Sequence, residues 1–225
     1  MIHLAMETSG LSASVAVLDG ERLLAVGETG PQVRTAAGLA PLVRDVLGRA
    51  DVRLGNVKLI SLPVGPGSFT GLRVGVTTAK TLAYALGCEV LGLDTLEVIA
   101  AQAPDEVRNL WAVVDAQRQQ LFVRRYEKSD TRWAASGVAT IVDNDEFLSS
   151  LTARDVVTGP GLKRVVAQVP AGVAMIDESL WPPQAETVGR LAYAKFQAGE
   201  RSDLWQLVPE YFRPSAAEEK RAASR

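Results

Sequence analysis

The residues whose types and spacing could support chemistry lie in a glycine-rich stretch, residues 62–75, with the sequence LPVGPGSFTGLRVG. The apolar run 59–62 before it predicts a buried strand, and a weakly charged helix is expected to follow from Thr70 to Leu86. Glycine lets a ligand or another backbone approach closely. Serine and threonine cap helix N-termini, whose free N–H groups bind anions. The candidates for a phosphate contact are Gly65, Gly67, Ser68, Thr70 and Gly71.

The same stretch departs from the best-known phosphate loops. No Gly-Lys-Ser/Thr sequence closes it, so it is not a Walker A loop. Its third glycine comes one residue too late for a dinucleotide fingerprint, and it belongs to a second βα unit rather than a first. A tight strand-to-helix corner, with close helix packing at Gly71 and Gly75, accounts for the glycines equally well. Both interpretations stay open on the sequence alone.

Catalytic partners for this stretch are scarce. His3 is the only histidine, so a histidine-based metal site is excluded, and a Ser-His-Asp or Cys-His arrangement would have to use it. It alternates with apolar neighbours on an expected strand, which favours a structural role. The carboxylates of Glu7, Asp19 and Asp115 form no pair that the sequence identifies, so we expect no catalytic residue and no metal site.

The composition is that of an ordinary globular protein with one large domain or two lobes. Of 225 residues, 47% are hydrophobic and 22% are charged, and the formal net charge of −2 argues against a stand-alone nucleic-acid binder. Cys88 is the only cysteine, so there is no disulfide framework. The first residues lack the pattern of a signal peptide, and no apolar run is long enough to span a membrane. We therefore expect a cytoplasmic protein without a membrane contact.

The hydrophobic pattern predicts two α/β lobes. The first lobe is expected to hold strands at 2–6, 13–18, 23–26, 59–62 and 89–93, and helices at 35–49, 70–86 and from 94 onward. The polar break at 103–106 is the expected boundary, which divides the chain into 1–104 and 105–225. The second lobe is expected to hold strands at 110–114 and 156–158, helices at 162–168 and 185–198, a rigid linker at 181–183 and a solvated charged run at 218–221.

As a whole string, residues 65–75, GPGSFTGLRVG, closely resemble the signature of the TsaB (YeaZ) family of bacterial tRNA-modification proteins. Asp115-Ala116, the turn 159–161 and the closing residues 209–213 resemble weaker family features, so the resemblance covers nearly the whole chain. It implies an actin/sugar-kinase/Hsp70-like α/β fold with two lobes, each a mixed sheet flanked by helices. The expected order of elements, three antiparallel strands and then helix, strand, helix and strand, agrees with such a lobe.

The resemblance also implies a subunit without its own catalytic centre. Members of the family pair with TsaD, which transfers threonylcarbamoyl to the adenosine next to the anticodon of tRNA, and the ATPase TsaE joins them. No cofactor is then expected on this chain alone, ATP is a candidate at an interface within the complex, and tRNA would be bound through the complex. An ATP-using relative would need a glycine-rich Asp-Gly hairpin where this chain has Asp115-Ala116-Gln117, which argues against autonomous kinase or ATPase chemistry.

The helix expected at 70–86 is apolar nearly all round, with Arg73 and Lys80 as its only charges, so it is either buried or meets a partner. In the family, this helix and the one at 35–49 form the dimerisation surface. The resemblance thus assigns to a partner interface Leu39, Leu42, Arg73, Val74, Gly75, Thr78, Ala79 and Leu82. A homodimer through the same helices is an alternative when TsaD is absent.

An enzymatic function is the main alternative: a glycoprotease-like peptidase or an ATP-dependent phosphotransferase that uses the loop at 65–70. The chain also departs from the family at four positions. Glu7 stands where relatives have aspartate, and Thr35 begins a stretch that lacks their histidine. Gln117 and Gln120 replace their arginine and glutamate. We favour a structural role for Glu7 in its turn over a metal–phosphate role.

Overall fold

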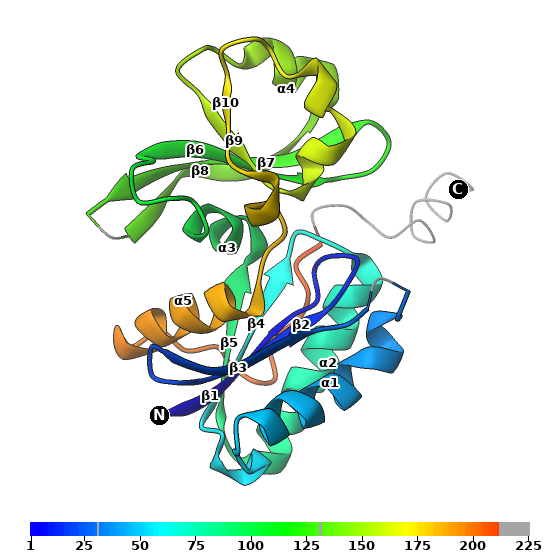
Figure 1. Ribbon diagram of the computed structural model, residues 1–225, viewed down its shortest axis with the longest axis vertical. Coiled ribbons are helices and arrows are strands. Elements are labelled where there is room, and N and C mark those ends of the chain that lie inside the picture. Colours follow the sequence, from blue (N-terminus) through cyan, green and yellow to red (C-terminus); the bar gives the residue numbers. More distant parts are fainter. Residues whose placement is uncertain (31, 131, 212–225) are drawn as a thin grey trace.

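The computed structural model describes residues 1–30, 32–130 and 132–211, which form two lobes, each built on a five-stranded sheet (Figure 1). The strand order of the first sheet is β3-β2-β1-β4-β5. Strands β1 to β3 form an antiparallel meander, and β4 and β5 run parallel to β1. The strands are β1 (Ile2–Glu7), β2 (Ser14–Asp19), β3 (Arg22–Glu28), β4 (Leu59–Gly65) and β5 (Glu89–Asp94).

The second sheet repeats this topology. Its order is β10-β9-β6-β7-β8, in which β6 to β8 form the meander and β9 and β10 run parallel to β6. The strands are β6 (Asn109–Asp115), β7 (Gln120–Ser129), β8 (Arg132–Asp143), β9 (Val156–Thr158) and β10 (Ala174–Met175). The predicted fold class is confirmed in its architecture: an α/β fold with two lobes, each a mixed sheet flanked by helices.

Helices cover both faces of the first sheet, which explains why its strands are apolar on both sides. Helices α1 (Thr35–Arg49) and α2 (Phe69–Leu86) lie on one face, and α5 (Ala185–Gln197) lies on the other (Figure 1). Successive side chains of a strand point to opposite faces, so Leu4 packs with α1 and α2 while Ala5 packs with α5. Between these layers, all 7 residues of β4 are buried.

The last helix of each lobe packs against the sheet of the other lobe. Helix α3 (Thr95–Ala101) follows β5, yet it buries Leu96 and Ile99 together with Leu110 and Tyr126 of the second sheet. Helix α5 follows the second sheet and packs against β1, β2 and β4 of the first. The expected lobe boundary after residue 104 stays a prediction. It lies between the two sheets in sequence, while α5, which comes after it, returns to the first sheet.

The remaining helices are short and lie mostly in the second lobe. They are η1 (Leu54–Asn56), α4 (Asn144–Ser150), η2 (Pro160–Arg164), η3 (Val166–Gln168) and η4 (Glu178–Leu180). The expected helix at 162–168 is wrong. Two short 3₁₀ helices occupy the stretch, because Val165, with φ −126° and ψ 4°, breaks the helical backbone between them. The ends of α1, α2 and α5 agree with the prediction to within one residue. The run at 218–221 lies outside the described residues.

Two chain segments connect the lobes, one after α3 and one before α5, and Gln102 joins them. Its side-chain amide donates to the carbonyl oxygens of Leu180 (2.7 Å) and Pro182 (2.9 Å). Its Oε1 accepts from the N–H of Gln184 (2.7 Å). Because three hydrogen bonds of one side chain bridge both connections, Gln102 restricts the movement of one lobe relative to the other.

We expect Gln102→Ala to lower the free energy of unfolding by about 1–3 kcal/mol, because it removes these hydrogen bonds. The variant should also be cleaved faster in the connection at 180–184 during limited proteolysis. Urea unfolding and the cleavage rate measure the two effects. Gln206→Ala, at an exposed position, is the matched control, and equal behaviour of the two variants would contradict a role of Gln102 in joining the lobes.

Candidate functional site

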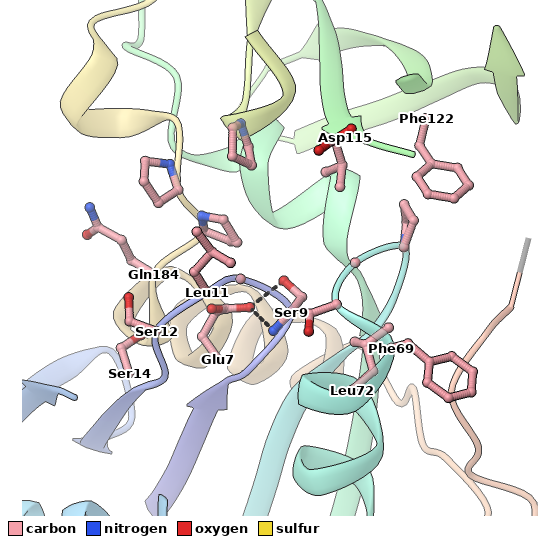
Figure 2. A pocket seen from close by; sticks show the side chains of 18 of the residues that line it. Glu7, Ser9, Leu11, Ser12, Ser14, Phe69, Leu72, Asp115, Phe122 and Gln184 are labelled. Carbon is pink, nitrogen blue, oxygen red and sulfur yellow. Dashed lines mark hydrogen bonds between the residues drawn. The ribbon is translucent and has the colours of Figure 1, made fainter. Parts of the chain in front are cut away.

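A cleft of about 1640 Å³ lies between the lobes. The first lobe lines it with the turn after β1 and the loop before α2, and the second lobe lines it with the β6–β7 hairpin and η2 (Figure 2). Of the candidates for a phosphate contact, Gly67 and Ser68 line the cleft, whereas Gly65, Thr70 and Gly71 lie outside its lining. The phosphate contact itself stays a prediction.

The loop before α2 is a tight corner that uses its own polar groups. Gly65 has a φ of 147°, which side chains rarely allow, and the peptide bond to Pro66 is cis. Ser68 caps the helix, because its Oγ accepts from the N–H of Gly71 (3.2 Å). The N–H of Ser68 donates to the carbonyl oxygen of Ser9 (2.7 Å). The N–H groups of Ser68 and Gly71, at the start of the helix, are therefore bonded within the protein and are not free to bind an anion.

The glycines of this stretch let α2 touch the turn after β1. A Cβ at Gly71 would overlap the carbonyl oxygen of Thr8, and a Cβ at Gly75 would overlap Thr8 Oγ1. A Cβ at Gly67 would lie 2.7 Å from Ser9. No side chain fits between these backbones. Close helix packing, one of the two interpretations of the sequence, is confirmed at Gly71 and Gly75.

We expect Gly71→Ala to destabilise the protein by about 1–3 kcal/mol, because the added methyl group meets backbone that has no room to move. Gly48→Ala is the matched control, since Gly48 is an exposed residue of α1 with nothing within 4 Å of an added Cβ. It should gain up to about 1 kcal/mol from the higher helix propensity of alanine. Thermal or urea unfolding measures both changes. A stable Gly71→Ala variant would contradict the packing role.

Glu7, at the end of β1, is buried in the cleft wall. Its Oε1 accepts from the N–H of Ser9 (2.6 Å) and from the Ser9 hydroxyl (Figure 2). The expected turn role of Glu7 is therefore confirmed. Burial raises the pKa of Glu7 from 4.5 to about 7, although hydrogen bonds from Ser9 and Gly10 act in the opposite direction.

We expect the stability of the wild type to fall between about pH 5 and pH 8 more steeply than that of Glu7→Gln. The folded chain keeps a proton on Glu7 that the unfolded chain releases above pH 4.5. The stabilisation is full below that pH and is lost as the pH rises through about 7. The gap between the two pKa values corresponds to roughly 3 kcal/mol. Urea unfolding across this range measures the effect, and parallel curves for both proteins would contradict it.

The β6–β7 hairpin faces these residues from the second lobe, and Figure 2 shows Asp115 across the cleft from Ser9. Residues 117–119, Gln-Arg-Gln, have φ values of 62°, 54° and 61°, the left-handed region that usually favours glycine. Asp115 supports this turn. Its carboxylate accepts from the N–H of Gln117 (2.9 Å) and from Nε of Arg164 (2.5 Å). The hairpin therefore keeps a glycine-like backbone while it carries side chains at the cleft.

Comparisons with known proteins agree with this architecture. A family model described as TsaD: tRNA N6-adenosine threonylcarbamoyltransferase matches residues 34–161. The solved structure of YeaZ from Pseudomonas aeruginosa is 30% identical, with a TM-score of 0.81 over 94% of this chain and 99% of that chain. The chain belongs to the TsaB (YeaZ) family.

Two bacterial TsaB proteins, both named for tRNA threonylcarbamoyladenosine biosynthesis, are also similar. The protein of Escherichia coli is 25% identical over 96% of each chain. The protein of Bacillus subtilis is 31% identical in a match that spans 56% of each chain, so this chain covers about half the length of that relative.

In this member of the TsaB family, His3 has the expected structural role. Its ring is buried and stacks on Tyr193 with centroids 5.6 Å apart, and Nε2 forms a hydrogen bond with the carbonyl oxygen of Gly20 (2.8 Å). Burial lowers the pKa of His3. The residue is not part of the cleft lining that contains Ser68. A peptidase that pairs Ser68 with His3 is therefore not favoured by this geometry.

Within residues 1–30, 32–130 and 132–211, no three His, Cys, Asp or Glu side chains are grouped as metal ligands. In the same part of the chain, no helix combines the length and apolar character that crossing a membrane requires.

The residues assigned to a partner interface divide into core and surface. Leu39 and Ala79 are 1% and 0% exposed, and Gly75 is buried against Thr8. Contrary to their expected place at an interface, these three are core residues, because their surface is already covered within the lobe. Arg73 is exposed, and half-buried positions are held by Leu42, Val74, Thr78 and Leu82.

The C-terminal segment, defined here as residues 203–211, runs along α2, which the sequence pattern does not predict. Lys80 Nζ donates to the carbonyl oxygens of Trp205 and Leu207 (3.1 Å each), and the Trp205 ring packs edge-on against Tyr84. Near the start of the helix, Tyr211 contacts Arg73. The family resemblance at 209–213 is the one sequence signal for this segment, and its last two residues lie outside the described chain.

Proposed function

We propose that this chain is a subunit without a catalytic centre of its own, which docks onto TsaD through the outer faces of α1 and α2. In this complex, TsaD transfers threonylcarbamoyl to the adenosine next to the anticodon of tRNA. TsaE and tRNA join through the complex, and ATP binds at a shared interface. The observation that carries the proposal is that small or apolar side chains are exposed along the outer faces of these two helices, in a chain that belongs to the TsaB family.

Helices α1 and α2 lie together on the outside of the first lobe (Figure 1). Small or apolar side chains are exposed along them, at Ala36, Ala40, Thr77, Thr81 and Tyr84. A helix surface with small side chains lets another helix approach closely. This surface therefore suits packing against a second pair of helices.

The cleft gives further support, because three of its polar side chains that could bind or react are already engaged within the chain. Ser68 caps α2, and Asp115 is paired with Arg164. Glu7 holds its own turn, and its raised pKa makes it a weak ligand for a hard cation. These residues do not fit a metal-bound triphosphate on this chain alone. An ATP site would need groups from TsaD.

We expect Thr78→Arg to weaken binding to the TsaD of the same organism at least about tenfold, because a long charged side chain would hold the helix surfaces apart. Thr78 is half-buried on α2. The matched control is Thr140→Arg, at an exposed position of β8 in the second lobe, which should bind like the wild type. Titration calorimetry measures the affinities, and urea unfolding checks that both variants are folded.

A wild-type chain that fails to bind TsaD at micromolar concentrations would contradict the proposal. The alternative is a homodimer, and light scattering at two protein concentrations tests it by measuring the molar mass of the chain in solution. A homodimer through the same helices would dissociate on dilution, and added TsaD would displace it if the two partners share one surface.

A further inference from the structure

Arg73 lies where the outer face of α2 meets the cleft. Its guanidinium carbon is 3.8 Å from the centre of the Phe69 ring and 5.5 Å from the centre of the Tyr211 ring. Its Nε donates to the Tyr211 hydroxyl (2.7 Å), and the two rings are 4.9 Å apart. An exposed arginine is thereby held in one position by two aromatic rings, one from α2 and one from the C-terminal segment.

The charge of Arg73 is not balanced inside the described part of the chain. Among residues 1–30, 32–130 and 132–211, no carboxylate forms an ion pair with it, and the Tyr211 hydroxyl is its one side-chain hydrogen-bond partner there. Lys80, the other cation of α2, differs, because its ammonium group donates to two backbone carbonyl oxygens. Lys80 thus holds the C-terminal segment, whereas the two terminal nitrogens of Arg73 have no hydrogen-bond partner among the described residues.

The surrounding helix pair is basic. Helices α1 and α2 contain four basic residues and one acidic residue, Asp45, which pairs with Arg49 (3.0 Å). The whole chain has a formal net charge of −2, so these two helices are more basic than the chain as a whole. Complementary charge steers partners and selects among them, which favours an acidic partner surface here.

We propose that Arg73 is the anchor of the docking surface and binds a carboxylate of the partner protein. This inference rests on the docking proposed above and adds the chemistry of the contact. The planar guanidinium bonds both oxygens of one carboxylate through two parallel N–H groups. Phe69 and Tyr211 hold the side chain in place before binding, and their exposed rings would be covered together with the ion pair in the complex, as in an interface hot spot.

The experiment is a titration of the full chain with TsaD of the same organism, at several salt concentrations, with Arg73→Glu and Arg73→Lys. Arg73→Glu should weaken binding at least about 30-fold and reduce the dependence of Kd on salt. Arg73→Lys should bind more tightly than Arg73→Glu but more weakly than the wild type, because lysine keeps the positive charge and cannot form the bidentate hydrogen bonds. The control is Arg154→Glu, which makes the same change in charge at an exposed site of the second lobe and should stay within about twofold of the wild type.

Each outcome separates the two proposals. If Arg73→Glu binds TsaD as well as Arg154→Glu does, the anchor is overturned while docking stands. If the wild type does not bind TsaD, both are overturned. Urea unfolding of Arg73→Glu checks that the variant is folded. Tyr211→Phe is a second variant, which keeps the aromatic ring and removes the hydroxyl. It should bind about two- to fivefold more weakly, because it removes only the hydrogen bond that orients Arg73.

Discussion

The contact between α2 and the turn after β1 is the constraint on which the rest of the structure depends. Gly71 and Gly75 bring the helix against Thr8, and Ser9 accepts a hydrogen bond from the N–H of Ser68. This contact fixes the position of α2 on the first sheet. The same turn follows Glu7, which is buried in the cleft wall and whose pKa is raised by that burial. One pattern of glycines therefore shapes both the cleft and the helix surface beside it.

The cleft and the helix surface differ in how their polar groups are used. In the cleft, the carboxylates of Glu7 and Asp115 are bound by neighbouring groups of the chain, so a ligand would first have to replace those partners. Arg73, where α2 meets the edge of the cleft, is held in place by aromatic rings and lacks a carboxylate partner among the described residues. This difference favours Arg73 and the adjoining surface of α2, rather than the carboxylates of the cleft, as the place where a partner binds.

Helices α3 and α5 each pack against the sheet of the other lobe, and this exchange joins the two lobes into one unit that includes the outer surface of α1 and α2. Each helix fills the core under the sheet of the other lobe, and Gln102 joins the two connections that make the exchange. Helices α1 and α2 thus belong to a lobe whose orientation relative to the other lobe is restricted by α3, by α5 and by the hydrogen bonds of Gln102. A surface that is already ordered loses less conformational entropy on binding, which favours its use as a docking platform.

The sequence by itself determines the local elements and the family. The ends of α1 and α2 follow from apolar periodicity and from the cap at Ser68, which act within a few residues, and the string at 65–75 is enough to indicate the family. Tertiary structure decides which side of these elements is covered. Because α2 is apolar nearly all round, its sequence does not distinguish the buried Ala79 from positions that stay at the surface. The repeated topology of the two sheets, the raised pKa of Glu7 and the contact of Arg73 with Tyr211, 138 residues away, all depend on segments that only folding brings together.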